Sequence, residues 1–592
     1  MRSYSTLKNR SEGNNKNPTD VRIRIVGVLF ICTFAIVVVK LFMLMVLQHD
    51  FYTALASGAQ EASTKLIPRR GEIFFQDSRT GEEFPLAINR DMYIMFADTR
   101  EIKDDKTAED DVLQLAQVFS YSDDRKNTLK IQLNKRTDAY EPIEKKVDDD
   151  TMNKVKQMQL VGIHFVRVPY RYYPEEMLAS QVIGFVGKDE NGNDIGRYGA
   201  EGYWNNELAG SGGFFEGTKS AKGSWITLAG SLMKPAVDGA DMVLTIDRTL
   251  QFKACEKLLE AQTKYGAQSS ALIIMEPQTG AIRAMCSFPT FDPNEYNKVQ
   301  DAQAFNNSAI FTPYEPGSIF KPIAMSGVLN EKIANPETPF FDSGSSDAGC
   351  TKVIKNADLK AYGAQTMTGI LQHSINTGMV YVANLLGKQK FLEYINNYGF
   401  GTKTGLELDV EASGTVQNLY QNKGNKIDCY TATAAFGQGI TVTPLQMVNA
   451  YSAIANGGIL MKPYIVGEVR YSDGRIEKTK PKEIRRVIEK KYASLLSAML
   501  VRVVDFEATL AHIPGYFMAG KTGTAQIPGP GGYTDDKNHS YVGFGPVDDP
   551  KFVMIIKFEK PTKEVYSSMT AAPTFKDIAQ FILQYYQIPP SK

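Results

Sequence analysis

The most continuous apolar run in the chain lies near its start, between Ile25 and Leu47. Its 23 residues carry one charge, Lys40, which lies close enough to the end of the run to reach a membrane interface. At ~1.5 Å per residue, a helix of this length would span about 35 Å, enough to cross a bilayer core. In residues 1–24, six basic side chains outnumber two acidic ones, an excess typical of a cytoplasmic flank. The pattern predicts a polar cytoplasmic tail at 1–24, a single transmembrane helix at 25–47, and an extracytoplasmic remainder.

A cleaved signal peptide is the alternative interpretation of this run, because Ala54-Leu55-Ala56 resembles a small-residue cleavage site. The apolar core of a signal peptide is only ~7–15 residues long, and Asp50 separates the run from that site. The pattern therefore favours an uncleaved anchor.

Beyond the anchor, the pattern predicts two regions. Residues 48–235 contain charge-rich, apolar-poor segments such as "EIKDDKTAEDD", which are typical of exposed helices and loops, and a break at 234–241 predicts a boundary. In 236–592, "DMVLTI" predicts a strand, "RTLQFKACEKLLEAQTKYG" an amphipathic helix, and "SSALIIMEPQTGAIRAMCSF" a hairpin. Three strand-like runs and a helix close the chain, whereas most segments between 318 and 505 are predicted as helix. We expect an α+β domain in which a helix-rich insert separates parts of one antiparallel sheet.

Composition excludes several classes of function. Apolar residues make up 43% of the chain and charged residues 22%, and 66 basic residues balance 66 acidic ones, so no global charge favours nucleic acid. The five histidines form no H-E-x-x-H pattern, and the cysteines form no C-x-x-C pair, so neither a metal nor a cofactor is expected. The spacing of the cysteines suggests no disulfide framework and leaves their pairing open; they are Cys32, Cys255, Cys286, Cys350 and Cys429.

The first segment with candidate catalytic residues is "YEPGSIFKP", residues 314–322. Ser318 and Lys321 lie one helical turn apart at the start of a predicted helix, so their side chains share a face. Ser318 could simply cap the helix, although a lysine is disfavoured in a first turn. As a nucleophile, Ser318 would need a base. Lys321 could serve only if burial or a nearby cation lowered its pKa from the usual ~10.4.

Two further segments supply the groups that this chemistry needs. "AGKTGTAQ", residues 519–526, provides Lys521 in a strand-like run, with glycines that allow another backbone to approach closely. "HSINTG", residues 373–378, provides Ser374, which could relay a proton, and Asn376, which could bind a substrate amide. Each pattern is weak alone, but the three in this order, at a helix start, an inter-helix loop and a strand, are much more specific.

The three patterns resemble the active-site set of penicillin-binding proteins and serine β-lactamases. Further stretches resemble class B penicillin-binding proteins, the monofunctional peptidoglycan DD-transpeptidases. They are "RRGEIF" (69–74), "LTIDRTLQ" (244–251), "MEPQTGAIRAMCSFPTFDPN" (275–294), "FGQGITVTPLQMVNAYSAIANGG" (436–458) and "AAPTFKDIAQ" (571–580). The resemblance covers nearly the whole chain after residue 65, with a loose fit between about 95 and 165.

This resemblance implies a fold and an activity. It implies an elongated pedestal domain, similar to the penicillin-binding protein dimerisation domain, at 48–235. A penicillin-binding/β-lactamase-like transpeptidase domain would follow at 236–592. Ser318 would form an acyl-enzyme with a peptidoglycan stem peptide or a β-lactam, and Lys321 would take its proton. Ser374 and Lys521 would protonate the leaving D-alanine, while Asn376 would bind a substrate amide. The remaining substrate-binding and oxyanion residues would be Thr522, Gly523 and Thr524.

The resemblance also implies a location and partners. We expect a single-pass protein of the cell membrane, with its catalytic domain outside, that works with a polytopic glycan polymerase and other division or elongation proteins. A catalytically idle scaffold or β-lactam sensor of the same fold is the alternative function. Septal, elongation and sporulation roles, the acceptor amine and the oligomeric state stay open.

A competing pattern lies at residues 515–522, where "GYFMAGKT" satisfies the phosphate-loop consensus. Its three bulky, strand-forming residues and the proline- and glycine-rich stretch that follows argue against a loop that opens a helix. Nucleotide binding is therefore not predicted.

Overall fold

The structure is a computed structural model that describes residues 18–43, 61–66, 68–219, 225–226, 232–421 and 424–591. They fall into two compact units, Met1–Pro68 with Ser211–Val237 and Arg69–Gly210 with Asp238–Lys592.

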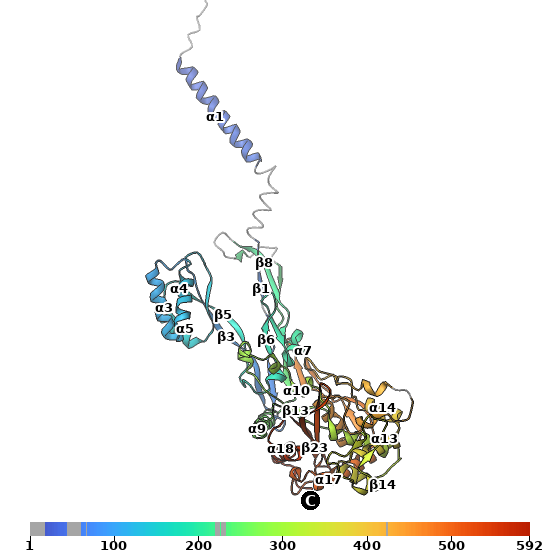
Figure 1. Cartoon of the computed structure of the whole chain (residues 1–592). Helices are drawn as coiled ribbons and strands as arrows, with labels where there is room; N and C mark the ends of the chain where they lie inside the picture. Colours follow the sequence, from blue (N-terminus) through green and yellow to red (C-terminus); the bar gives the residue numbers. More distant parts are fainter. Residues whose placement is uncertain are drawn as a thin grey trace, which may run out of the picture. The chain divides into compact units, whose positions relative to one another are not determined.

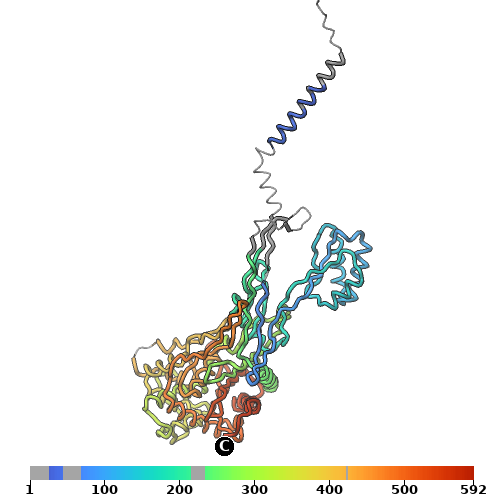
Figure 2. Tube along the Cα trace, turned by 180° about the vertical axis from the view of Figure 1, so that it is seen from behind, coloured from blue at the N-terminus to red at the C-terminus, as the bar shows by residue number. Residues whose placement is uncertain are grey.

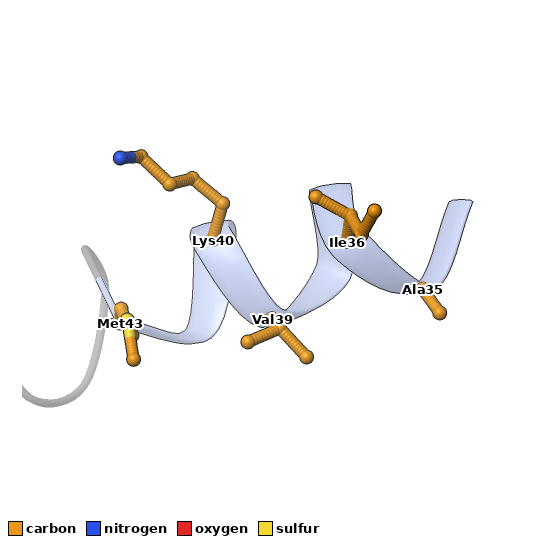
Figure 3. A pocket seen from close by; sticks show the side chains of 5 residues that line it. All are labelled: Ala35, Ile36, Val39, Lys40 and Met43. Carbon is orange, nitrogen blue, oxygen red and sulfur yellow. The ribbon is translucent and has the colours of Figure 1, made fainter. Parts of the chain in front are cut away.

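The first unit begins with helix α1 (Pro18–Phe42), which coincides with most of the predicted span. Residues 44–47 of that span, and residues 1–17 of the predicted tail, lie outside the described residues. Figure 3 shows five side chains at and just beyond the C-terminal part of α1, where Lys40 extends toward the side on which Met43 lies. Among the described helices, none reaches the length and hydropathy expected of a membrane span.

The same unit contains a small antiparallel sheet. Strand β8 lies between β1 and β10 and also pairs with β9. The bounds are β1 (Glu61–Leu66), β8 (Gly213–Lys219), β9 (Trp225–Ile226) and β10 (Leu232–Lys234).

The second unit contains a seven-stranded sheet with the order β20-β19-β11-β2-β3-β4, in which β5 pairs with β3. Its strands are β2 (Ile73–Gln76), β3 (Glu83–Ala97), β4 (Glu141–Val147), β5 (Ile163–Tyr172), β11 (Asp241–Leu244), β19 (Val466–Arg470) and β20 (Ile476–Lys478). Three helices pack with β3, β4 and β5 around one apolar cluster and form the light-blue group in Figure 2. They are α3 (Asp105–Phe119), α4 (Asp123–Leu133) and α5 (Asp149–Gln157).

Short elements connect this sheet to the rest of the unit. The helices are α6 (Ser180–Ile183), α7 (Gly199–Tyr203) and α8 (Asn205–Ala209), and a hairpin joins β6 (Phe185–Lys188) to β7 (Asp194–Arg197).

A five-stranded antiparallel sheet, in the order β13-β12-β24-β23-β22, forms the centre of the region after residue 241. Its strands are β12 (Ser269–Met275), β13 (Ile282–Phe288), β22 (Ala519–Gly529), β23 (Gly532–Gly545) and β24 (Phe552–Glu559). The predicted hairpin and the three C-terminal strands are thus confirmed, because their apolar residues belong to a sheet covered on both faces.

Successive side chains of β12 belong alternately to two apolar clusters. Leu272 and Ile274 join the cluster formed with α9 (Arg248–Tyr265) and α18 (Ala571–Tyr585), which lie beside β13 and β23 in Figure 1. Ala271 and Ile273 join the larger cluster formed with the helices of the insert. This period-two division is the expected result of strand geometry.

The insert is mainly helical, as predicted. Its helices are α10 (Ser308–Phe311), α11 (Lys321–Asn330), α12 (Met367–Gln372), α13 (Asn376–Leu386), α14 (Lys388–Asn397), α15 (Cys429–Ala434), α16 (Pro444–Ala455) and α17 (Lys490–Phe506). It also contains short antiparallel pairs that the sequence did not indicate. They are β14 (Pro339–Asp342) with β17 (Gly363–Thr366), β15 (Ser345–Ser346) with β16 (Ile354–Lys355), and β18 (Ile459–Met461) with β21 (Glu483–Arg486).

Two disulfides correct the expectation of no disulfide framework. Cys255 in α9 is bonded to Cys286 in β13, and Cys350 is bonded to Cys429 at the start of α15. The partners are 31 and 79 residues apart, so no local spacing could reveal them. Each pair is brought together only by the packing of separate elements.

Candidate active site

Ser318 lies in a tight turn directly before α11. The turn is a 3₁₀ helix, η4 (Gly317–Phe320), and its N-cap is Pro316, while the N-cap of α11 is Phe320. Ser318 therefore caps neither helix, and the capping interpretation of this serine is wrong.

Neighbouring backbone segments hold this turn tightly. Gly317 adopts φ +58° and donates its N–H to the carbonyl of Gly437 at 3.0 Å. A Cβ at Gly317 would lie 3.0 Å from the Cβ of Ala525. Both the left-handed backbone and the close approach explain the glycine.

Lys321 is fully buried at the start of α11. Its Nζ donates to the Ser374 carbonyl, to Ser374 Oγ at 3.2 Å and to Asn376 Oδ1 at 2.9 Å. Burial, followed by the positive charge of Lys521, holds its pKa well below the usual value, although the Glu507 carboxylate acts in the opposite direction. Burial and a second cation, either of which could lower the pKa of a lysine base, are both present.

Ser374 and Asn376 lie at the junction of two helices. The chain leaves α12 at Gln372, Ser374 adopts φ +55°, and α13 begins at Asn376. A left-handed serine is uncommon, and such residues cluster at functional sites. This conformation turns the chain sharply, so that the Ser374 hydroxyl and the Asn376 amide oxygen both reach Lys321 Nζ.

Lys521 lies on β22 with its side chain fully buried, and Thr522 next to it is 5% exposed. Lys521 Nζ donates to Glu507 Oε2 at 2.6 Å, and Thr522 Oγ1 donates to Glu507 Oε1 at 2.9 Å. Glu507 follows directly after α17 and was missed from the sequence. It belongs to none of the three patterns, and its position fourteen residues before Lys521 carries no recognisable signal.

At Gly523, strand β22 approaches the Ser318 turn closely. A Cβ here would lie 2.7 Å from Ser540 Oγ, 3.0 Å from Ile319 Cγ2 and 3.0 Å from the Pro316 carbonyl oxygen. Within the described residues β22 is an edge strand of its sheet, so its outer side faces this turn rather than another strand. Thr524, two residues further, accepts a hydrogen bond from Ser567 N at 3.1 Å.

Glu315 is a second residue that sequence reasoning missed. It is 7% exposed and accepts hydrogen bonds from Gly439 N at 3.0 Å and from the Tyr533 hydroxyl at 2.9 Å. Burial raises its pKa, against the effect of these two bonds. The carboxyl group thus ties the loop that holds Gly317 to the tip of the β22–β23 hairpin.

The phosphate-loop pattern has no matching structure. The residues after Lys521 continue as strand β22 to Gly529, where a phosphate loop would open a helix. Among the described residues, no group of three or more histidine, cysteine, aspartate or glutamate side chains is placed to hold a metal ion.

The sequence matches two family models. The "Penicillin binding protein transpeptidase domain" matches residues 270–580, and the "Penicillin-binding Protein dimerisation domain" matches residues 65–244. "Stage V sporulation protein D" of Bacillus subtilis is 31% identical over 97% of this chain and 87% of its own length. "Peptidoglycan D,D-transpeptidase FtsI" of Escherichia coli is 28% identical over 86% of this chain and 82% of its own length.

Solved structures are similar as well. Penicillin binding protein 3 from Mycobacterium tuberculosis, complexed with aztreonam, aligns with a TM-score of 0.67 and 25% identity, over 89% of this chain and 98% of that one. Penicillin Binding Protein 2X from Streptococcus thermophilus gives a TM-score of 0.71 at 21% identity, over 89% of this chain and 81% of that one, which supports the fold alone.

Proposed function

This chain belongs to the class B penicillin-binding proteins, and we propose that Ser318 is the residue on which it forms its acyl-enzyme. It is a serine-type peptidoglycan D,D-transpeptidase and a target of β-lactams. The arrangement around Lys321 carries the assignment of Ser318, because a buried lysine with a lowered pKa lies one helical turn from this serine.

In the proposed reaction, Ser318 Oγ attacks the carbonyl carbon between the two terminal D-alanines of a stem peptide. The Ser318 proton passes to the neutral amine of Lys321, and the carbonyl oxygen becomes an oxyanion. The N–H groups of Ser318 and Thr524 would receive this oxyanion, and one such donor contributes roughly 3–4 kcal/mol. The C–N bond then breaks and leaves the acyl group on Ser318.

Protonation of the leaving amine completes the first half of the reaction. Ser374, which is hydrogen-bonded to Lys321 Nζ, would deliver a proton to the departing D-alanine, and Lys521 would supply positive charge. An amine of a neighbouring stem peptide would next attack the acyl-enzyme, and Ser318 would regain its proton. Asn376, which accepts a hydrogen bond from Lys321, would also bind a substrate amide.

The substrate carboxylate would be held by residues of the edge strand β22. Thr522, Thr524 and Lys521 provide hydroxyl groups and a cation along one short stretch. Gly523 allows this stretch to lie directly against the Ser318 turn. A hydroxyl-and-lysine set of this kind suits a carboxylate, which accepts several hydrogen bonds at once.

We also propose the location and organisation of the chain. Residues 25–47 would form a single membrane anchor with residues 1–24 in the cytoplasm, which the apolar run and its basic flank support. A pedestal at 48–235 would carry the transpeptidase domain at 236–592. This domain would work beside a polytopic glycan polymerase and other division or elongation proteins.

Covalent labelling tests the assignment. The detergent-solubilised protein would be treated with a fluorescent penicillin beside Ser318→Ala, and the labelled peptide would be mapped by mass spectrometry. We expect one label on Ser318 that is lost in the variant. A folded wild-type protein that takes no label would instead favour the catalytically idle scaffold.

A further inference from the structure

Helix α13, which carries Asn376, lacks a cap of its own. The first N–H groups of a helix have no partner within the helix, and a polar side chain at the N-cap usually binds one of them. The N-cap of α13 is Ile375, which offers no side-chain acceptor. Instead, Asn356 Oδ1 accepts hydrogen bonds from the N–H of Asn376 at 3.0 Å and of Thr377 at 3.3 Å. A residue twenty positions upstream therefore caps this helix.

Asn356 is itself fixed from both sides. Only 2% of it is exposed, and its Nδ2 donates to Asp342 Oδ2 at 2.7 Å and to the Lys360 carbonyl at 2.8 Å. Asp342 is also buried and accepts a hydrogen bond from Thr377 Oγ1 at 2.6 Å. This amide–carboxylate pair is therefore held rigidly against the first turn of α13.

Asp342 adds a charge to this arrangement. Burial opposes its ionised form, but hydrogen bonds from Thr377, Gly344, Tyr362 and Asn356 outweigh burial and hold its pKa below the usual value. An anion near a helix N-terminus is stabilised by the helix dipole. Asp342 thus strengthens the cap electrostatically.

The same segment also orients the Asn376 side chain. Asn376 Nδ2 donates to the carbonyl of Lys355, the residue before Asn356, at 3.2 Å. With Nδ2 held there, Oδ1 points to Lys321 Nζ, 2.9 Å away. The segment between β14 and β17 therefore fixes both the backbone and the amide of Asn376.

We propose that Asn356 and Asp342 are positioning residues for the transpeptidase reaction, because they cap the first turn of α13 and thereby place Asn376, whose amide oxygen contacts Lys321. This inference rests on the proposed roles of Lys321 and Asn376. Without the Asn356 side chain, the N–H groups of Asn376 and Thr377 lose their acceptor. The first turn of α13 can then shift, and Asn376 moves with it.

The test is Asn356→Ala, measured as the second-order rate of acylation by a fluorescent penicillin. We expect a loss of about 10–100-fold, the size of effect that a displacement of about 1 Å produces in an active site. The matched control is Asp148→Ala, which removes the cap of α5, where Asp148 Oδ1 accepts from Thr151 N at 2.7 Å. The control should acylate within about twofold of wild type.

A double-mutant cycle separates positioning from a general loss of structure. If Asn356 acts through Asn376, then adding Asn356→Ala to Asn376→Ala should change the acylation rate by less than about twofold. A full additional loss in that background would overturn the proposal.

The pH profile gives a second readout. Lys321, on which Lys521 and Glu507 are the charged groups that act, donates a hydrogen bond to Asn376 Oδ1. A displacement of Asn376 in Asn356→Ala would change this bond and therefore the pKa of Lys321, so the acidic limb of the acylation–pH profile would shift. A merely structural loss would leave the limb in place.

Two variants of Thr377 provide a separate test if Asn356→Ala does not fold. Thr377→Val removes a donor to both Asp342 and Asn356, whereas Thr377→Ser keeps it, so acylation should fall in the first and recover in the second. Equal rates in these two variants would contradict the proposal.

The failure of this inference can be distinguished from the failure of the proposed function. If the wild-type protein takes no label, Ser318 is not the nucleophile. If the wild type is labelled normally and Asn356→Ala is acylated at the wild-type rate, only the role of Asn356 is contradicted.

Discussion

Gly523→Ala tests whether the edge strand and the Ser318 turn must touch. The added Cβ would meet the Pro316 carbonyl oxygen at 3.0 Å and Ile319 Cγ2 at 3.0 Å, whereas ordinary contacts begin at 3.4 Å. Ser540 Oγ, 2.7 Å away, belongs to a buried side chain and would also have to move. The carbonyl oxygen belongs to the backbone of the turn, so the turn and the strand must separate by about 0.4 Å.

This separation should affect both acylation and stability. The oxyanion donors proposed at Ser318 and Thr524 lie on opposite sides of this contact, so the distance between them would change. We expect the acylation rate to fall about 10–100-fold, while overpacking lowers the free energy of unfolding by about 1–3 kcal/mol. Stopped-flow acylation with a fluorescent penicillin and thermal unfolding would measure the two effects.

Gly467→Ala is the matched control for this variant. Gly467 lies in strand β19, where a Cβ would meet its nearest atoms at 3.4 and 3.5 Å, an ordinary contact distance. Its acylation rate should stay within about twofold of wild type. If Gly523→Ala also acylates at the wild-type rate, the close approach has no catalytic role and our account of the strand is wrong.

Three further predictions follow from charges and cross-links. Glu507→Gln removes the carboxylate that raises the pKa of Lys321. Because the base must be neutral, the acidic limb of the acylation–pH profile should move to lower pH, and a limb that stays or rises would contradict this. Replacing Cys350 and Cys429 together by serine opens a 79-residue loop and should lower the free energy of unfolding by about 2–4 kcal/mol; equal denaturation midpoints would refute it. Asp111 is buried and one of its carboxyl oxygens has no hydrogen bond, and burial raises its pKa to about 6. Because the folded state binds this proton more tightly than the unfolded state, protonation of Asp111 stabilises the fold at low pH. This contribution is lost as the pH rises through about 6. Asp111→Asn should therefore stabilise the protein at pH 8 by about 1–2 kcal/mol and little at pH 4, which thermal unfolding at the two pH values would check.

Local patterns predicted much of the fold. Helix α9, the β12–β13 hairpin and helix α18 all follow from periodicity, because each buries one face or both against a neighbouring layer. The pairs β14–β17 and β15–β16 were not predicted, since strands of two to four residues are too short to show a period.

The chemistry of the site was predictable only where function restricts residue type. A serine nucleophile requires a base, and a lysine base requires burial or a nearby cation to lower its pKa, so Lys321 directed attention to Lys521. Glu507, Glu315 and Asn356 obey no such rule. Each acts through contacts between residues 14 to 218 positions apart, which arise only when the chain is folded.

The most direct test of the central claim uses substrate rather than inhibitor. The full-length protein in detergent would receive a thioester mimic of a stem peptide that ends in D-alanine, together with an amine acceptor. Intact mass and peptide mapping would follow the adduct, and chromatography would follow the transfer product. We predict an adduct on Ser318 that decays as product forms, is absent in Ser318→Ala and forms slowly in Lys321→Ala. Product formation by Ser318→Ala, or an adduct on another residue, would contradict the account.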